Sequence, residues 1–271
     1  MRIKEIIDRL EAWAPSETAE SYDNPGLQIG RPDAEVSGVL VGLDLTPDLI
    51  TQALRAEANL IITHHPLFFA PIKSLTPSSL VGAMALRLAE QGIAHYAIHT
   101  NLDAARGGVS FALARQLGLE RVDFLETRDG EAAGTGLGAI GALVKAMPIE
   151  EFLVHVAESL NLAGIRHVSR AEATIRRVAV CGGSGSSFLS QALDAGADAY
   201  VTADVKYHQF FDVLDPAGNP RLAYLDVGHY ESERITEQLL VDYLAGDFPD
   251  LPVHRAAAST SPISQFVRPS A

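Results

Sequence analysis

Apolar residues along the chain fall into two alternating patterns. Some segments carry apolar residues at the three-to-four-residue spacing of a helix, and others are short continuous runs typical of buried strands. Residues 46–58 begin with Thr46-Pro47, a helix-start signal. Strands and helices that alternate in this way predict an α/β fold. We expect helices at 1–20, 46–58, 80–91, 109–117, 149–160, 188–195 and 232–244, and strands at 39–43, 60–63, 94–99, 177–181, 199–202 and 222–227.

The pattern contains an internal repeat. Residues 39–69 align without gaps with residues 178–208, and Gln52-Ala53-Leu54 matches Gln191-Ala192-Leu193 in register. Convergent α/β patterning is the alternative to duplication, but the shared tripeptide favours duplication. The turn-rich segment 127–137 marks the predicted boundary. We therefore expect a first α/β repeat at 1–126 and a second at 127–271, with a C-terminal tail that returns to the first.

Composition and charge narrow the class of protein. The 271 residues are 47% hydrophobic, which is enough for a sizeable core, and the net charge is −13. That charge opposes binding to nucleic acid or to an anionic membrane. With Cys181 as the single cysteine, no signal-peptide pattern and no window near the ~20 apolar residues of a membrane span, we expect a cytoplasmic protein.

Metal-type side chains follow several of the predicted strands. In α/β folds, ligands gather at the carboxyl ends of strands. Neighbouring side chains on an extended backbone point to opposite faces, so an adjacent histidine pair suits two ions better than one unless the chain turns there. A lone histidine is more often structural, and a glutamate in a first helical turn often complements the helix dipole. The candidate ligands at these strand ends are His64, His65, Asp103, His229 and Glu233.

Five ligands exceed the three protein ligands typical of one catalytic zinc ion. They suit two ions about 3.5–4 Å apart that share a bridging carboxylate. Mixed imidazole and carboxylate donors fit Zn, Fe, Mn or Ni. The sequence therefore predicts a site for two divalent metal ions and leaves the identity of the metal open.

The motifs around these residues resemble a dinuclear-metal family labelled GTP cyclohydrolase I type 2 homologue, which includes the eukaryotic NGG-one-interacting factor three. The resemblance implies two intertwined α/β repeats with mixed sheets and a dinuclear metal site between them. It also implies a homohexamer, built as a toroid of dimers, and the same five metal ligands. The matching motifs are Ser21–Gln28, Ile62–Pro66, Ile98–Ala104, Cys181–Ser186, Thr202–His208 and Gly228–Glu233.

The family label suggests a metal-dependent hydrolase of a nucleotide-like small molecule. A dinuclear site can activate water as a metal-bound hydroxide for attack on an electrophilic carbon such as guanine C8, which would open the ring of GTP. A phosphoester or an amide is an equally suitable target. The alternative is a metal-binding hexameric assembly or regulatory protein without catalysis of its own.

Other polar residues in the motifs have two interpretations each. His99 is a candidate catalytic proton shuttle beside the metals, or a structural histidine at a strand end. Lys206 could bind a substrate phosphate or form a salt bridge, and Asp204 and His208 have no assigned role. The glycine-rich segment 182–185 lacks the Gly-Lys-Ser/Thr of a P-loop, so a tight turn is the preferred interpretation.

Overall fold

The computed structural model describes residues 1–128, 134–264 and 266. The chain forms two compact units. The first contains Met1–Ala105 together with Thr236–Pro262, and the second contains Arg106–Ile235 and the described residues from Ile263 onward. The chain thus leaves the first unit, builds the second, and returns to complete the first.

A five-stranded mixed sheet with the order β1-β4-β3-β2-β11 forms the centre of the first unit. β2, β3, β4 and β11 run parallel to one another, and β1 runs antiparallel to β4 at the edge of the sheet. The strands are β1 (Gly26–Ile29), β2 (Val39–Gly42), β3 (Leu60–Thr63), β4 (Ala94–Ala97) and β11 (Val253–Arg255). The helices are α1 (Ile3–Trp13), η1 (Ser16–Thr18), α2 (Pro47–Arg55), α3 (Leu80–Gln91), α4 (Thr100–Ala104) and α9 (Ile235–Asp247), whose first residue belongs to the second unit.

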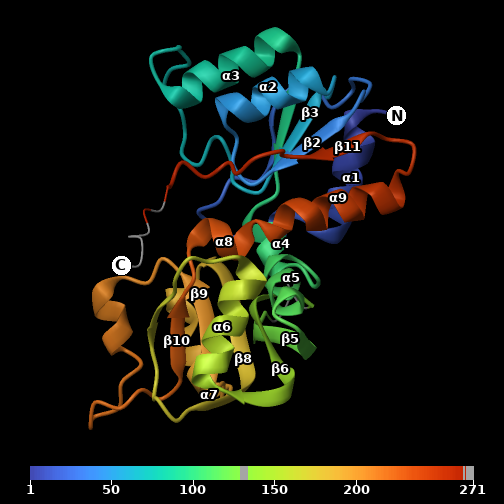
Figure 1. Ribbon diagram of the computed structural model, residues 1–271. Helices are drawn as coiled ribbons and strands as arrows, with labels where there is room; N and C mark the ends of the chain where they lie inside the picture. The colour runs from blue at the N-terminus through green and yellow to red at the C-terminus, as the bar shows by residue number, and fades with distance from the viewer. Residues whose placement is uncertain (129–133, 265, 267–271) are drawn as a thin grey trace. The chain divides into compact units, whose positions relative to one another are not determined.

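Helices cover both faces of this sheet. Leu40 and Ile61 face α2 and α3 in one apolar cluster. On the other side, Tyr96 donates a hydrogen bond to Glu11 of α1, and Trp13 of α1 stacks on Tyr243 of α9. Figure 1 shows α2 and α3 together on one side of β2 and β3, with α1 and α9 on the other. Because both faces are covered, β2, β3 and β4 are buried along their whole length, as expected for parallel strands.

The second unit is built on a six-stranded mixed sheet with the order β5-β6-β8-β9-β10-β7. Its strands are β5 (Leu119–Thr127), β6 (Gly136–Pro148), β7 (Arg166–Val168), β8 (Thr174–Ser184), β9 (Ala199–Ala203) and β10 (Ala223–Asp226). Its helices are α5 (Val109–Gln116), α6 (Ile149–Leu160), η3 (Ser186–Phe188), α7 (Leu189–Asp194), η4 (Tyr207–Phe211) and α8 (His229–Glu233).

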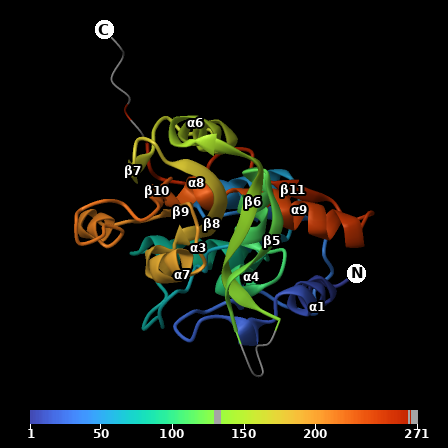
Figure 2. The same cartoon turned by 90° about the horizontal axis from the view of Figure 1, so that it is seen from below.

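This second sheet is also covered on both faces. Alternate residues of β8 and β9, such as Val178 and Val201, pack with α5 and α6. The intervening residues, such as Ala179 and Tyr200, pack with α7. Figure 2 shows α6 and α7 on opposite sides of β8, β9 and β10.

The two units share one pattern of strand pairing. β2 pairs with β3 so that Val39 lies opposite Leu60, and β8 pairs with β9 so that Val178 lies opposite Ala199, which preserves the offset of the sequence repeat. A third parallel strand follows in each unit, β4 or β10, and an antiparallel strand pairs with it, β1 or β7. The fold is therefore mixed α/β, and the matched register supports an internal duplication.

The boundary between the units differs from the one the sequence suggests. β5 and β6, which flank the turn-rich segment, pair within one sheet, where Thr127 lies opposite Gly136. Turn residues close hairpins as readily as they link domains, so composition alone does not separate the two cases. Among the described residues, no helix combines the length and the apolar character needed to cross a bilayer.

Candidate metal centre

His64 and His65 follow β3 directly, where the chain bends. Their backbone N–H groups donate to the carbonyls of Gly42 and Leu43 at the end of neighbouring β2. The two imidazole rings lie 5.1 Å apart between centroids. The alternation expected of an extended backbone ends at Thr63, because the bend brings the two rings together.

His99 adds a third imidazole from the end of β4. It is the N-cap residue of α4, and its ring centroid lies 5.1 Å from that of His64 and 5.4 Å from that of His65. One ring nitrogen from each of these three histidines lies within 4.8 Å of the others. Asp103, one turn along α4, places Oδ1 3.9 Å from Nε2 of His64. The first unit therefore gathers four of the residues that the sequence singles out.

Each of the three histidines has its Nδ1 beside a fixed oxygen acceptor. Nδ1 of His64 donates to the carbonyl of Ile98 at 2.8 Å, because a carbonyl oxygen can only accept. Nδ1 of His65 lies 2.7 Å from Oδ1 of Asp44. These contacts place the hydrogen on Nδ1 and the lone pair of the neutral ring on Nε2, which is the arrangement seen in metal-binding histidines.

His99 follows the same rule through Asp23. Nδ1 of His99 lies 2.7 Å from Oδ1 of Asp23, and Thr100 donates to Oδ2 from its backbone at 3.0 Å and from its hydroxyl at 2.5 Å. Burial raises the pKa of Asp23, but hydrogen bonds from His99 and Thr100 outweigh it and hold the pKa well below its ordinary value. Asp23 is therefore an ionised acceptor that orients His99.

The second unit holds the other two predicted ligands on one turn of helix. His229 and Glu233 are the first and last residues of α8, and Nε2 of His229 lies 3.0 Å from Oε2 of Glu233. Nδ1 of His229 lies 2.7 Å from Oδ2 of Asp204, which follows β9 in a left-handed conformation with φ of 55°. Aspartate tolerates this conformation better than most residues. Asp204 thus does for His229 what Asp44 does for His65.

Two carboxylates on one ring favour its protonated form. The hydrogen bond to Glu233 raises the pKa of His229 to about 9, burial opposes this, and Asp204 adds to it. Without a metal ion, His229 is therefore an imidazolium that neutralises the buried carboxylate of Glu233. A metal ion on Nε2 would replace this proton.

The glycine-rich end of β8 gives room to Glu233. Gly183 has φ of 61°, and a Cβ there would lie 2.1 Å from Oε1 of Glu233 and 3.2 Å from Nε2 of His229. Its N–H donates to Oγ of Ser232, and that of Gly185 donates to Oγ1 of Thr202. These N–H groups are engaged within the protein, so the segment is not an anion loop, and residues 182–184 are the last residues of β8 rather than the tight turn that the sequence suggests.

A buried histidine supports the backbone of the histidine pair. The hydroxyl of Thr63 donates to the carbonyl of His65 at 2.6 Å and so accepts from Nε2 of His95 at 2.7 Å. Burial lowers the pKa of His95 to about 3, so this ring is neutral. His95 is a structural residue, and it does not belong to the group of imidazoles near His64.

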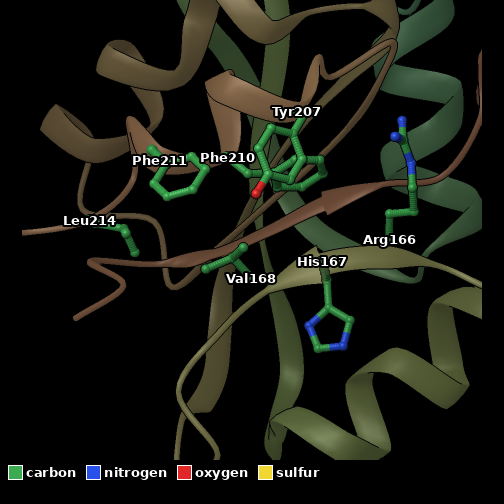
Figure 3. Close-up of a pocket in the computed structure, with 7 residues that line it drawn as sticks. All are labelled: Arg166, His167, Val168, Tyr207, Phe210, Phe211 and Leu214. Atoms are coloured by element: carbon green, nitrogen blue, oxygen red, sulfur yellow. The ribbon is translucent and has the colours of Figure 1, made fainter. Parts of the chain in front are cut away.

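An apolar pocket of about 260 Å³ lies beside η4 in the second unit. Figure 3 shows Tyr207, Phe210 and Phe211 gathered on one side of it and Arg166 at one end. Arg166 donates to Asp226, which is 7% exposed. The same carboxylate accepts the backbone N–H groups of Val205 and Gly228, the neighbours of Asp204 and His229 in the sequence. Asp226 therefore holds both Arg166 of the pocket and the backbone next to Asp204 and His229.

The sequence pattern indicates the imidazoles but not most of the groups that accept a hydrogen bond from their Nδ1 atoms. Asp44 follows β2, so the strand-end rule that pointed to the histidines would also have found it. Asp23 carried a weak signal as part of a motif without an assigned role. Lys206 and His208 lie exposed at η4, and no role follows from their contacts.

Known proteins resemble the chain over nearly all of its length. The family model described as Duf34/NIF3 (NGG1p interacting factor 3) matches residues 1–262. A GTP cyclohydrolase 1 type 2 homolog of Streptomyces coelicolor is 38% identical over 86% of this chain and 81% of its own length, and one of Lactococcus lactis is 32% identical over 97% and 98%. The crystal structure of a Staphylococcus aureus hypothetical protein has a TM-score of 0.89 at 29% identity and covers 98% of this chain and 99% of its own.

Proposed function

Since the chain belongs to the Duf34/NIF3 family, we propose that it is a metal-dependent hydrolase of a nucleotide-like small molecule. Two divalent ions supply the reactive centre in this proposal. Their proposed ligands are His64, His65, Asp103, His229 and Glu233.

The observation that carries the proposal is that four histidines have their rings oriented by the same kind of contact at Nδ1. His64, His65, His99 and His229 each place Nδ1 against a carbonyl or a carboxylate, which orients the ring and directs the lone pair of its neutral form to Nε2. The arrangement is typical of metal-binding histidines, and its occurrence at four histidines supports a metal site more strongly than any one of them alone. The donors are imidazoles and carboxylates, a set that suits Zn, Fe, Mn or Ni.

When bound, divalent ions polarise a substrate and lower the pKa of bound water. The chain's own residues supply orientation and proton transfer. Asp44 and Asp204 hold their histidines and raise the basicity of Nε2. His99 lies within the imidazole group while Asp23 holds its Nδ1, so we propose His99 as a further ligand or as the group that carries a proton at Nε2.

Metal analysis of purified variants tests the proposal. We expect about two divalent ions per chain in the wild type, and fewer in His64→Ala and in Glu233→Gln. His254→Ala removes an exposed histidine from β11 and is the matched control, which should keep the full metal content. Equal metal content in all four proteins would contradict the ligand assignment.

Turnover distinguishes a hydrolase from a metal-binding assembly. The metal-loaded protein should open or hydrolyse GTP, and the chelated protein should not. Protein that binds two ions but turns over no nucleotide, phosphoester or amide would support an assembly role instead. We also propose the homohexamer that the family resemblance implies, which native mass measurement tests directly.

A further inference from the structure

Two exposed aromatic rings stand beside the imidazole group of the first unit. Tyr22 is 63% exposed, Phe69 is 53% exposed, and their ring centroids lie 6.2 Å apart. The ring of Phe69 also lies 6.2 Å from that of His99, at an interplanar angle of 70°. We call Tyr22 and Phe69 the aromatic pair.

Hydrogen bonds from the segment 22–28, which runs into β1, hold the backbone that carries Phe69. The N–H of Phe68 donates to Oε1 of Gln28 at 2.8 Å, and the carbonyl of Phe68 accepts from Nδ2 of Asn24 at 2.6 Å. Gln28 in turn donates to the carbonyl of Asn24 at 2.6 Å. Two amide side chains thus fix both polar groups of one peptide residue, and Phe68 itself packs against the core. Phe69 is held in place although its own ring stays largely exposed.

The same segment orients one histidine of the imidazole group. Asp23 accepts from His99 and Thr100, and it lies directly between Tyr22 and Asn24 in the sequence. This short segment therefore orients His99 through the side chain of Asp23. It also contributes Tyr22 to the aromatic pair and, through Asn24 and Gln28, holds the backbone next to Phe69. Within the motif Ser21–Gln28, metal binding gives a reason for Asp23 but not for Tyr22, Asn24 or Gln28.

A rigid, exposed aromatic surface suits a flat ligand. Aromatic side chains stack on nucleobases and related heterocycles, and the loss of one such contact by alanine substitution weakens binding about 5- to 150-fold. We propose that Tyr22 and Phe69 form the platform on which the flat heteroaromatic ring of the substrate stacks beside His99. The proposal rests on the proposed function and deepens it, since it names the part of the substrate that the first unit recognises.

Binding measurements with two probes test the platform without any need for turnover. GTP has a ring and a triphosphate, whereas inorganic tripolyphosphate has only the charged part. In the metal-loaded protein, Phe69→Ala should weaken GTP binding about 5- to 150-fold and leave tripolyphosphate binding unchanged. Phe69→Trp should retain GTP binding. Phe211→Ala, which removes a ring that is 54% exposed in the second unit, should change neither.

A second variant separates the ring from its placement. Gln28→Ala keeps Phe69 but removes the acceptor of the Phe68 N–H, so we expect it to weaken GTP binding in the same selective way. Metal content and native mass should equal those of the wild type in every variant. A selective loss of GTP binding with full metal content supports the platform.

Three results would overturn the inference. The first is a Phe69→Ala protein that binds GTP as well as the wild type does, or that loses both probes equally. The second is a change in native mass, which would assign the aromatic pair to a subunit contact. The third is a wild type that binds tripolyphosphate but not GTP. Metal loss at the proposed ligands is measured separately, so the proposed function can stand when the platform fails.

Discussion

Gly183→Ala tests how closely the end of β8 is fitted to Glu233. The new Cβ would lie 2.1 Å from Oε1 of Glu233, whereas ordinary contacts lie at 3.4 Å or more, so the carboxylate must withdraw by about 1 Å. Metal–oxygen bonds of about 2.0–2.2 Å do not survive such a shift. We expect metal affinity to fall at least ~10-fold, by analogy with the loss of groups that orient ligands.

The substitution also places a side chain in the left-handed region, which costs about 1–2 kcal/mol by itself. Gly196→Ala is the matched control, because Gly196 has φ of 66° and a Cβ added there would meet nothing within 4 Å. Both variants should lose about 2–4 °C in melting temperature for each kcal/mol. Only Gly183→Ala should lose metal in a competition titration against a chelator. If both variants bind metal as the wild type does, Gly183 does not make room for a ligand.

Three further predictions follow from the contacts around the histidines. Asp44→Asn removes the charge beside Nδ1 of His65, so metal affinity should fall about 10–100-fold in chelator competition; unchanged affinity would contradict this role. The pKa of His229 is raised from 6.5 to about 9. In metal-free protein, the contribution of this ring to the free energy of unfolding is therefore complete below pH 6.5 and is lost as the pH rises through 9. The melting temperature should fall over that window in the wild type, and a His229→Gln protein that shows the same fall would refute the assignment. Asp226→Asn leaves Arg166 and two backbone N–H groups with a weaker acceptor, which should cost about 1–3 kcal/mol in urea unfolding, and an unchanged midpoint would contradict it.

The strands that the sequence predicts are those buried on both faces. β2, β3 and β9 are continuous buried runs, and their offset in the repeat reappears as the pairing register of both sheets. β5 and β6 escaped prediction because their burial is irregular and Gly136, Gly138 and Gly141 interrupt the pattern. Neighbouring atoms leave no room for side chains at these positions. A Cβ at Gly136, for example, would lie 2.3 Å from the carbonyl oxygen of Glu126. Such a requirement depends on tertiary contacts and leaves no periodic signal.

The candidate site could likewise be predicted only in part from the sequence. Histidines after strands are visible in the sequence because both the residue type and its position are informative. The pairing of His65 with Asp44, or of His99 with Asp23, joins segments that lie far apart in the chain, and nothing local in either segment indicates its partner. The short helices α4 and α8 were not predicted as separate elements, because five residues are too few to show a helical period.

The return of the chain to the first unit has a consequence for its synthesis. β11 pairs with β2 so that Val253 lies opposite Val39, and α9 supplies Glu237, which accepts the N–H of Leu43. The ribosome therefore completes the whole second unit before the first can close, and contacts so distant in sequence form slowly. Until then β2 has an open edge, the kind of surface that pairs with other chains. We expect the second unit to fold first and nascent chains that end before β11 to depend on chaperones.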